Sequence, residues 1–127
     1  MTPPDEITLT IPRDRALYGV AYLVLGGLGI RLNITIEHLE DLQLALETAL
    51  ERVRADTVQV RLRVEDGQIE ALVGPMGEGV RLELAADGGE DVGLRRILDT
   101  LVDHAELETD EGGDWLKLTK AAARTQV

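Results

Sequence analysis

The sequence contains no cysteine and no phenylalanine, and its aromatic residues are one tryptophan and two tyrosines. The absence of cysteine excludes disulfides, thiolate metal sites and cysteine nucleophiles. Because aromatic residues are scarce, the core must be built from aliphatic side chains, which are abundant in a chain that is 44% hydrophobic. A chain of 127 residues fits one domain with one core. We expect residues 1–127 to form a single domain with an ordered part over 6–120.

Basic residues are also scarce. The 13 Lys and Arg against 24 Asp and Glu give a formal net charge of -11. Such a chain repels phosphate backbones, which argues against nucleic-acid binding by phosphate neutralisation. The acidic surface favours a basic protein partner, or serves solubility alone. His38 and His104 have no metal-ligand spacing between them, so no metal site is predicted.

One uncharged run, residues 16–30, could be mistaken for a membrane anchor. It is shorter than the ~20 residues that a spanning helix needs, and it contains Gly19, Gly26, Gly27 and Gly29. The residues before it are acidic and include proline, unlike the basic start of a signal peptide. We expect a core helix in a cytoplasmic protein that does not contact a membrane.

Hydrophobic periodicity predicts the order of the elements. Strands are expected at 7–12, in a hairpin over 58–73 that turns at Asp66-Gly67, at 80–84 with a weaker pattern, and in two short closing strands around Leu107 and 115–118. Residues 74–79 are expected to break the chain. Helices are expected over about 14–32, 35–54 and 90–104. The first should turn these residues inward: Leu17, Ala21, Val24, Leu25 and Leu28. Helices mixed with mainly antiparallel hairpins predict a two-layer α+β sandwich.

Residues 35–54 give the clearest helical pattern, with Thr35 as the expected N-cap. The apolar stripe consists of Leu39, Leu42, Leu46, Ala49, Leu50 and Val53. A second stripe runs beside it: Glu40, Leu44, Glu47 and Glu51. Glu47 and Glu51 are like charges one turn apart, which costs the helix roughly a few tenths of a kcal/mol. This flank is either a solvated helix surface or the place of a carboxylate with a chemical role.

This order of elements and the local sequences resemble the histidine-kinase-like ATPase domain of the anti-sigma factor serine-protein kinase type. Residues 7–12 resemble its first strand, 29–33 with 36–42 its helix entry, and 93–103 with the Gly112-Gly113 turn its closing segment. The resemblance implies the family's Bergerat fold, a mainly antiparallel mixed sheet with helices on one face. It also implies a bacterial partner-switching regulator of sporulation or stress response that holds a sigma factor inactive, often as a homodimer. Active members use ATP and magnesium to phosphorylate a Ser or Thr of an antagonist protein.

The first family motif lies on the second helix. The family has a Glu there, followed four positions later by an Asn that ligates magnesium. Glu47 matches the Glu, which the resemblance implies is a general base, and Glu51 stands where the Asn should be. A carboxylate can also ligate magnesium, so this change alone does not remove the site.

The other two motifs depart further. In Asp-x-Gly-x-Gly, whose Asp reads the adenine amino group, Gly77 and Gly79 match, but Pro75 replaces the Asp. In Gly-x-Gly-Leu, which opens the last helix, Gly93 matches, but Asp91 replaces the first glycine. Asp91 puts negative charge at a helix end where the family binds phosphate.

These departures predict a degenerate member that keeps the fold and has lost ATP binding. We expect no cofactor; ATP and magnesium would bind only if the site survives, through Glu51, Gly77, Gly79 and Gly93, with Glu47 as base. The first functional hypothesis is an anti-sigma-type regulator that binds a sigma factor, its antagonist or both. The second is an active ATP-dependent serine/threonine kinase. The third is a structural dimerisation module.

Overall fold

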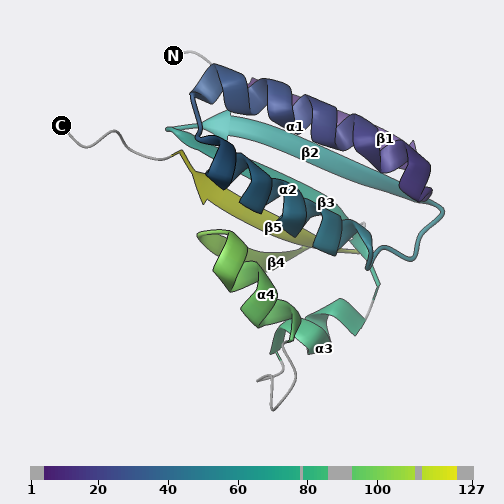
Figure 1. The fold of residues 1–127 in the computed structure, drawn as a ribbon. Coiled ribbons are helices and arrows are strands. Elements are labelled where there is room, and N and C mark those ends of the chain that lie inside the picture. The colour runs from purple at the N-terminus through teal and green to yellow at the C-terminus, as the bar shows by residue number, and fades with distance from the viewer. Residues whose placement is uncertain (1–4, 78, 86–92, 111–112, 123–127) are drawn as a thin grey trace.

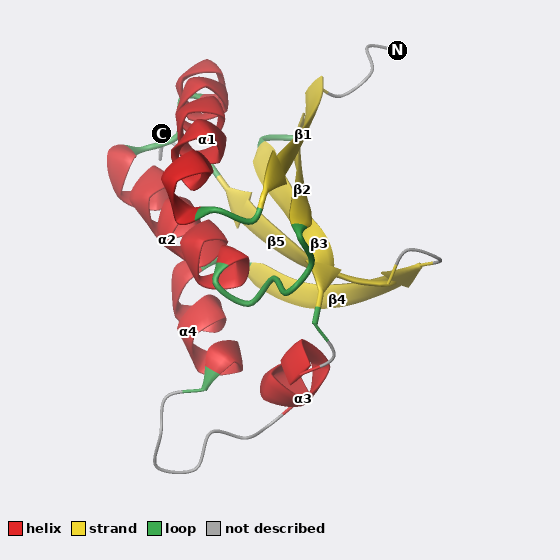
Figure 2. Ribbon diagram, turned by 90° about the vertical axis from the view of Figure 1, so that its right-hand side faces the viewer, coloured by secondary structure: helices red, strands yellow, loops and turns green. Residues whose placement is uncertain are grey.

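A five-stranded antiparallel sheet carries helices on one face (Figures 1 and 2). The computed structural model describes residues 5–77, 79–85, 93–110 and 113–122. The strand order is β1-β2-β3-β5-β4. The elements in chain order are β1 Asp5–Pro12, a 3-10 turn at Arg15–Leu17, α1 Tyr18–Leu32, α2 Ile36–Leu50, β2 Thr57–Glu65, β3 Gln68–Met76, α3 Gly79–Ala85, α4 Leu94–Leu101, β4 His104–Asp110 and β5 Gly113–Ala121. The predicted two-layer α+β sandwich is therefore confirmed.

The core lies between the sheet and the helices, and it is aliphatic, as the composition predicts. Figure 2 shows α1, α2 and α4 on the same side of the sheet. Alternate strand residues point to that side and are fully buried: Val58, Val60, Leu62, Ile69, Ala71, Val73, Leu116 and Leu118. The predicted hairpin turn is also present, since Asp66 and Gly67 both have positive φ angles, as a tight two-residue turn requires.

The helix α1 packs on the sheet and α2 with one side only. Ala21, Leu25 and Leu28 are buried, and Asn33 ends the helix in the predicted left-handed conformation with φ 60. The prediction for Leu17 is wrong: it lies in the 3-10 turn before α1 and is 37% exposed. Among the described residues, Arg15–Leu32 is the one helical stretch long and apolar enough to cross a membrane by composition. A core helix passes the same test.

The helix α2 follows its predicted pattern closely. The Thr35 hydroxyl accepts a hydrogen bond from the His38 backbone N–H at 3.2 Å and caps the helix. The predicted inward residues Leu42, Leu46 and Leu50 are buried. The helix ends at Leu50 rather than at residue 54.

Two predicted elements are wrong. β3 continues through the expected breaker to Met76, with an irregular register after Val73 and a cis peptide bond at Gly74-Pro75. The segment Gly79–Ala85 is a helix, not a strand. Its apolar residues fit both periods, and packing selects the helix: Val80 and Leu84, four residues apart, are buried, and Leu82 is 75% exposed.

The last helix is shorter than predicted. α4 ends at Leu101 because β4 begins at His104, inside the range expected to be helical. The predicted helix start at 90–92 and Gly112 lie outside the described residues.

Candidate functional site

The two glycines of the second motif line a small pocket where β3 meets α3. Its walls are Gly77, Gly79, Val80 and Glu83, together with Arg52 and Arg54 from beyond the end of α2. The volume of this pocket is about 110 Å³, well below the ~300–1,000 Å³ of ligand pockets. The described part of this site thus holds little free space.

Arg52 spans the gap between α2 and α3. Its Nε lies 3.2 Å from Glu83 Oε2, and its Nη1 donates to the Thr48 carbonyl at 2.9 Å. The Arg52 side chain is only 21% exposed. The Arg52 guanidinium, held by both Glu83 and the Thr48 carbonyl, fills the space next to Gly77 and Gly79, which we call the glycine loop.

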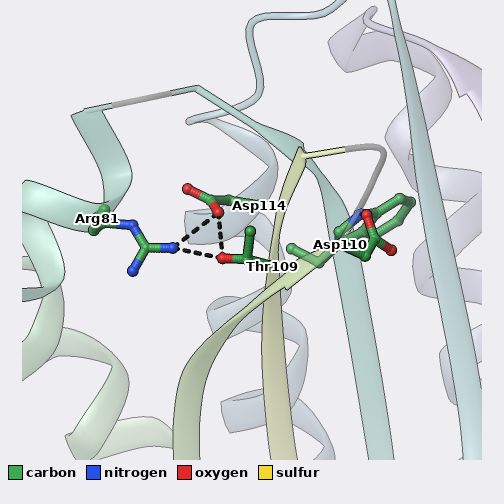
Figure 3. Close-up of polar contacts among 5 residues, drawn as sticks. Arg81, Thr109, Asp110 and Asp114 are labelled. Atoms are coloured by element: carbon green, nitrogen blue, oxygen red, sulfur yellow. Dashed lines mark hydrogen bonds and ion pairs between the residues drawn. The ribbon is translucent and has the colours of Figure 1, made fainter.

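The helix α3 has a second anchor on the β4–β5 hairpin. Arg81 Nη2 lies 2.9 Å from Asp114 Oδ1 and donates to the Thr109 hydroxyl at 2.6 Å (Figure 3). Thr109 in turn donates to Asp114 at 2.7 Å. These hydrogen bonds, first that of Thr109 and then that of Arg81, lower the pKa of Asp114 below its ordinary value of 3.8. α3 is thus tied to α2 on one side and to the sheet on the other.

Glu47, the predicted general base, and Glu51, the predicted magnesium ligand, do not lie at this pocket. Glu51 Oε1 is 3.6 Å from Nη2 of Arg15, which lies in the 3-10 turn that precedes α1. Burial, and after it the charges of Glu47 and Glu51, raise the pKa of Tyr22 on α1 above its ordinary value of 10.0. Glu47 lines a separate surface hollow of about 380 Å³ formed with Glu40, Gln43 and Leu44. Neither carboxylate lines the pocket at the glycine loop.

The residues after α2 that line the pocket at Gly77 and Gly79 are Arg52 and Arg54, and Arg52 comes one position after Glu51. Arg52 was not among the predicted site residues. The signal was available, because Thr48 and Arg52 have the same four-residue spacing as Glu47 and Glu51. Spacing alone does not decide which of two adjacent registers on a helix faces a given loop.

Pro75 lies in β3, within the segment that was expected to break the chain, and Gly93 opens the last helix as the motif implies. Pro75 packs near Gly113 of β5, where a Cβ on that glycine would lie 3.5 Å from Pro75 Cβ. Gly93 is the N-cap of α4, and its carbonyl accepts the Ile97 N–H at 3.1 Å, an ordinary helix start. Asp91 lies outside the described residues.

A larger hollow lies where the end of β1, the start of α1 and the end of α2 meet. Its volume is about 480 Å³, and it is lined by Arg13, Arg15, Tyr18, Leu50, Glu51, Val53 and Arg54. Over the described ranges, no group of three or more His, Asp or Glu side chains could hold a metal ion.

No protein-family model matches the chain. It is 25% identical to the serine-protein kinase RsbW of Halalkalibacterium halodurans, over 98% of this chain and 88% of that protein. A crystal structure of the RsbU and RsbW domains of a Mycobacterium tuberculosis protein matches with a TM-score of 0.62 and 18% identity, covering 96% of this chain and 33% of the solved one. The chain thus spans about a third of that solved protein. These similarities confirm the family resemblance and the fold predicted from the sequence.

Proposed function

We propose that this chain, a relative of the RsbW serine-protein kinases, is an anti-sigma-type regulator that acts by binding proteins and has lost ATP binding. Its partners would be a sigma factor, the antagonist of that factor, or both, and it would work in the cytoplasm as a homodimer. The single observation that carries this proposal is the ion pair between Arg52 and Glu83, which closes the space beside the glycine loop.

Two features support the loss of ATP binding. A nucleotide entering beside Gly77 and Gly79 would have to break the Arg52–Glu83 pair and move α3, which Arg81 also holds to the β4–β5 hairpin. The adenine amino group would then find no acceptor at Pro75, whose side chain is apolar. A donor left without its partner costs about 1–3 kcal/mol, so affinity and base specificity would both suffer.

The outer face of α1 supports protein binding. Val20, Leu23 and Ile30 share this face and are 43%, 79% and 80% exposed. A Cβ added at Gly26 or Gly27 would meet nothing within 4 Å, so another element could approach the helix closely. Contiguous exposed apolar surface of this kind marks interaction sites in soluble proteins.

The nucleotide part of the proposal is tested with the purified chain and magnesium-ATP. Calorimetry and thermal unfolding at millimolar ATP should show neither a heat of binding nor a shift in the unfolding temperature. The variant Arg52→Asn shortens the side chain that fills the pocket and removes its ion pair with Glu83. A magnesium-dependent shift with the wild-type chain would contradict the loss of ATP binding.

The protein-binding part is tested by pull-down against the sigma factors and antagonists of the host. The variant Leu23→Asp should weaken capture by at least about tenfold, because it puts a charge in the middle of the apolar face. Leu82→Asp is the matched control, since Leu82 is similarly exposed at 75% but lies on α3. Recovery of neither class of partner would contradict this part.

Two alternatives have observations in their favour. The similarity to a serine-protein kinase and the retained Gly77 and Gly79 favour an active kinase. Transfer of phosphate from ATP to a co-purified antagonist would establish it.

The exposed face of α1 would also serve a structural dimerisation module. A monomeric mass in solution would argue against that module.

A further inference from the structure

The hollow between the end of β1 and the end of α2 is rich in arginine. Arg13 comes from the connection after β1, Arg15 from the 3-10 turn and Arg54 from the segment after α2. Two segments that are distant in sequence, 13–15 and 51–54, therefore bring three arginines to one cavity of about 480 Å³. That volume lies within the ~300–1,000 Å³ of small-molecule sites.

The charge of this cavity is opposite to that of the molecule. The chain as a whole has a net charge of -11, whereas the cavity lining has three cationic side chains and one anionic side chain, Glu51. The carbonyl end of α2 adds about half a negative charge, which still leaves a positive excess. An acidic protein that gathers its few cations around one hollow creates a local attraction for anions.

The ion pairs and hydrogen bonds that these arginines make within the chain neutralise only part of the positive charge. Arg15 lies 3.6 Å from Glu51 and is 82% exposed, a loose ion pair. Arg54 Nη1 donates to the Glu51 carbonyl at 3.3 Å. Arg13 uses its backbone N–H to bond the Asp56 carbonyl, and within the described part of the chain its guanidinium has no ion-pair partner.

The floor of the cavity is apolar. Leu50 and Val53 are 1% exposed and Tyr18 is 6% exposed, so part of the cavity lining is buried and largely apolar. Charge-assisted hydrogen bonds are stronger at such a boundary than in free solvent. Arginine also presents its donors as a planar fork that fits carboxylate and phosphate oxygens.

We propose that this arginine-lined cavity binds a small, multiply charged oxyanion bearing phosphate or carboxylate groups, held by Arg13, Arg15 and Arg54. The site shares Arg54 with the pocket at Gly77 and Gly79, but its other lining residues are different. It needs neither magnesium nor an adenine contact. The proposal therefore goes beyond the regulatory function proposed above and does not depend on it.

The test uses isothermal titration of the full chain at low ionic strength with two probes, inorganic pyrophosphate and citrate, which separate phosphate from carboxylate ligands. The double variant Arg13→Gln/Arg54→Gln should weaken binding by at least about tenfold, which is the loss expected for charge-assisted hydrogen bonds. Arg96→Gln, which removes one positive charge from an exposed position on α4, should bind like the wild type.

A second variant separates binding from structural support. Glu51→Gln removes the one negative side chain of the cavity and should tighten binding of both probes, while a purely structural Glu51 would give no such gain. Circular dichroism checks that every variant is folded. Absence of measurable binding to either probe at millimolar concentration, or an equal loss in Arg96→Gln, would overturn the proposal. Because neither probe has a nucleoside, these outcomes leave the ATP test untouched.

Discussion

At the scale of single residues, Gly74 shows how closely the sheet is packed around the only tryptophan. A Cβ at Gly74 would lie 2.7 Å from Trp115 Cδ2 and 2.8 Å from Cε3. The indole is held in place, because its Nε1 donates to Asp110 at 3.1 Å and the Arg61 guanidinium lies 5.9 Å from the ring centroid. A rigid ring fixed on two sides cannot yield as the end of a flexible side chain can.

We therefore expect Gly74→Ala to destabilise the protein by about 1–3 kcal/mol, the usual cost of overpacking. Urea unfolding followed by tryptophan fluorescence measures the change. Gly27→Ala is the matched control: nothing lies within 4 Å of the added methyl group, and alanine in a helix is favoured over glycine by roughly 1 kcal/mol. Equal stability of Gly74→Ala and the wild type would show that the indole can shift freely.

Asp114 gives a prediction about acid stability. Hydrogen bonds from Thr109 and Arg81 lower its pKa below 3.8 in the folded protein. A carboxyl with a lower pKa in the folded state stabilises the protein above its unfolded pKa, and this contribution is lost as the pH falls through the folded pKa. Asp114→Asn should therefore flatten the fall in stability below about pH 4, as measured by urea midpoints across the acid range. Thr109→Val should flatten it in the same direction, and an unchanged acid profile in both variants would contradict this account.

The candidate site shows where residue-level prediction from sequence stops. Gly77 and Gly79 lie together as the motif implies, because they are neighbours in the chain. Glu47 and Glu51 do not join them; Arg52 does. Two adjacent registers of a helix flank differ by about 100° of rotation, and the face that meets a distant loop is set by packing of the whole domain.

At the scale of elements, α3 is the segment whose position depends on few contacts. It has seven residues, and only Val80 and Leu84 are buried. Its polar anchors are Arg52 to Glu83 and Arg81 to Asp114. A helix this short is marginally stable without such support. Loss of an anchor should therefore destabilise α3 more than the rest of the domain.

We expect Glu83→Gln and Arg81→Gln each to increase hydrogen exchange in residues 79–85, with little change in global stability, because exposed ion pairs contribute about 0–1 kcal/mol. Exchange mass spectrometry of peptides covering α3 and α4 measures the effect. Arg63→Gln removes an ion pair with Glu65 at 3.0 Å within β2 and should leave α3 unchanged. Unaltered exchange of α3 in both anchor variants would mean that apolar packing alone holds it.

Elements whose apolar residues follow one dominant spacing could be predicted from the sequence. Elements whose apolar residues fit both helical and strand spacing could not. The helix around Leu42, Leu46 and Leu50 and the hairpin turn at Asp66-Gly67 each have a local signal that packing reinforces. Residues 79–85 have apolar positions at both two- and four-residue spacing, so the environment decides. The extension of β3 through Gly74 and Pro75 likewise depends on a neighbour, β5, that lies far away in sequence.

At the scale of the whole molecule, the excess of acidic side chains acts on stability through mutual repulsion. With 24 Asp and Glu against 13 Lys and Arg, the folded state holds like charges closer together than the unfolded chain does. The described ion pairs oppose this only weakly, since pairs such as Arg15–Glu51 and Arg61–Glu6 are substantially exposed and separated by 3.6 and 3.7 Å. Screening should therefore relieve more repulsion than it removes attraction.

We expect the unfolding temperature to rise as sodium chloride increases from about 0.01 to 0.15 M, while the Debye length falls from about 30 to 8 Å. Potassium chloride should give the same rise, because screening depends on ionic strength and not on the cation. Differential scanning calorimetry at constant pH measures it. A fall in unfolding temperature over this range would mean that the exposed ion pairs, including the two that anchor α3, outweigh the net charge of -11. In that case the acidic surface would have to be treated as a network of specific pairs instead of a uniform field.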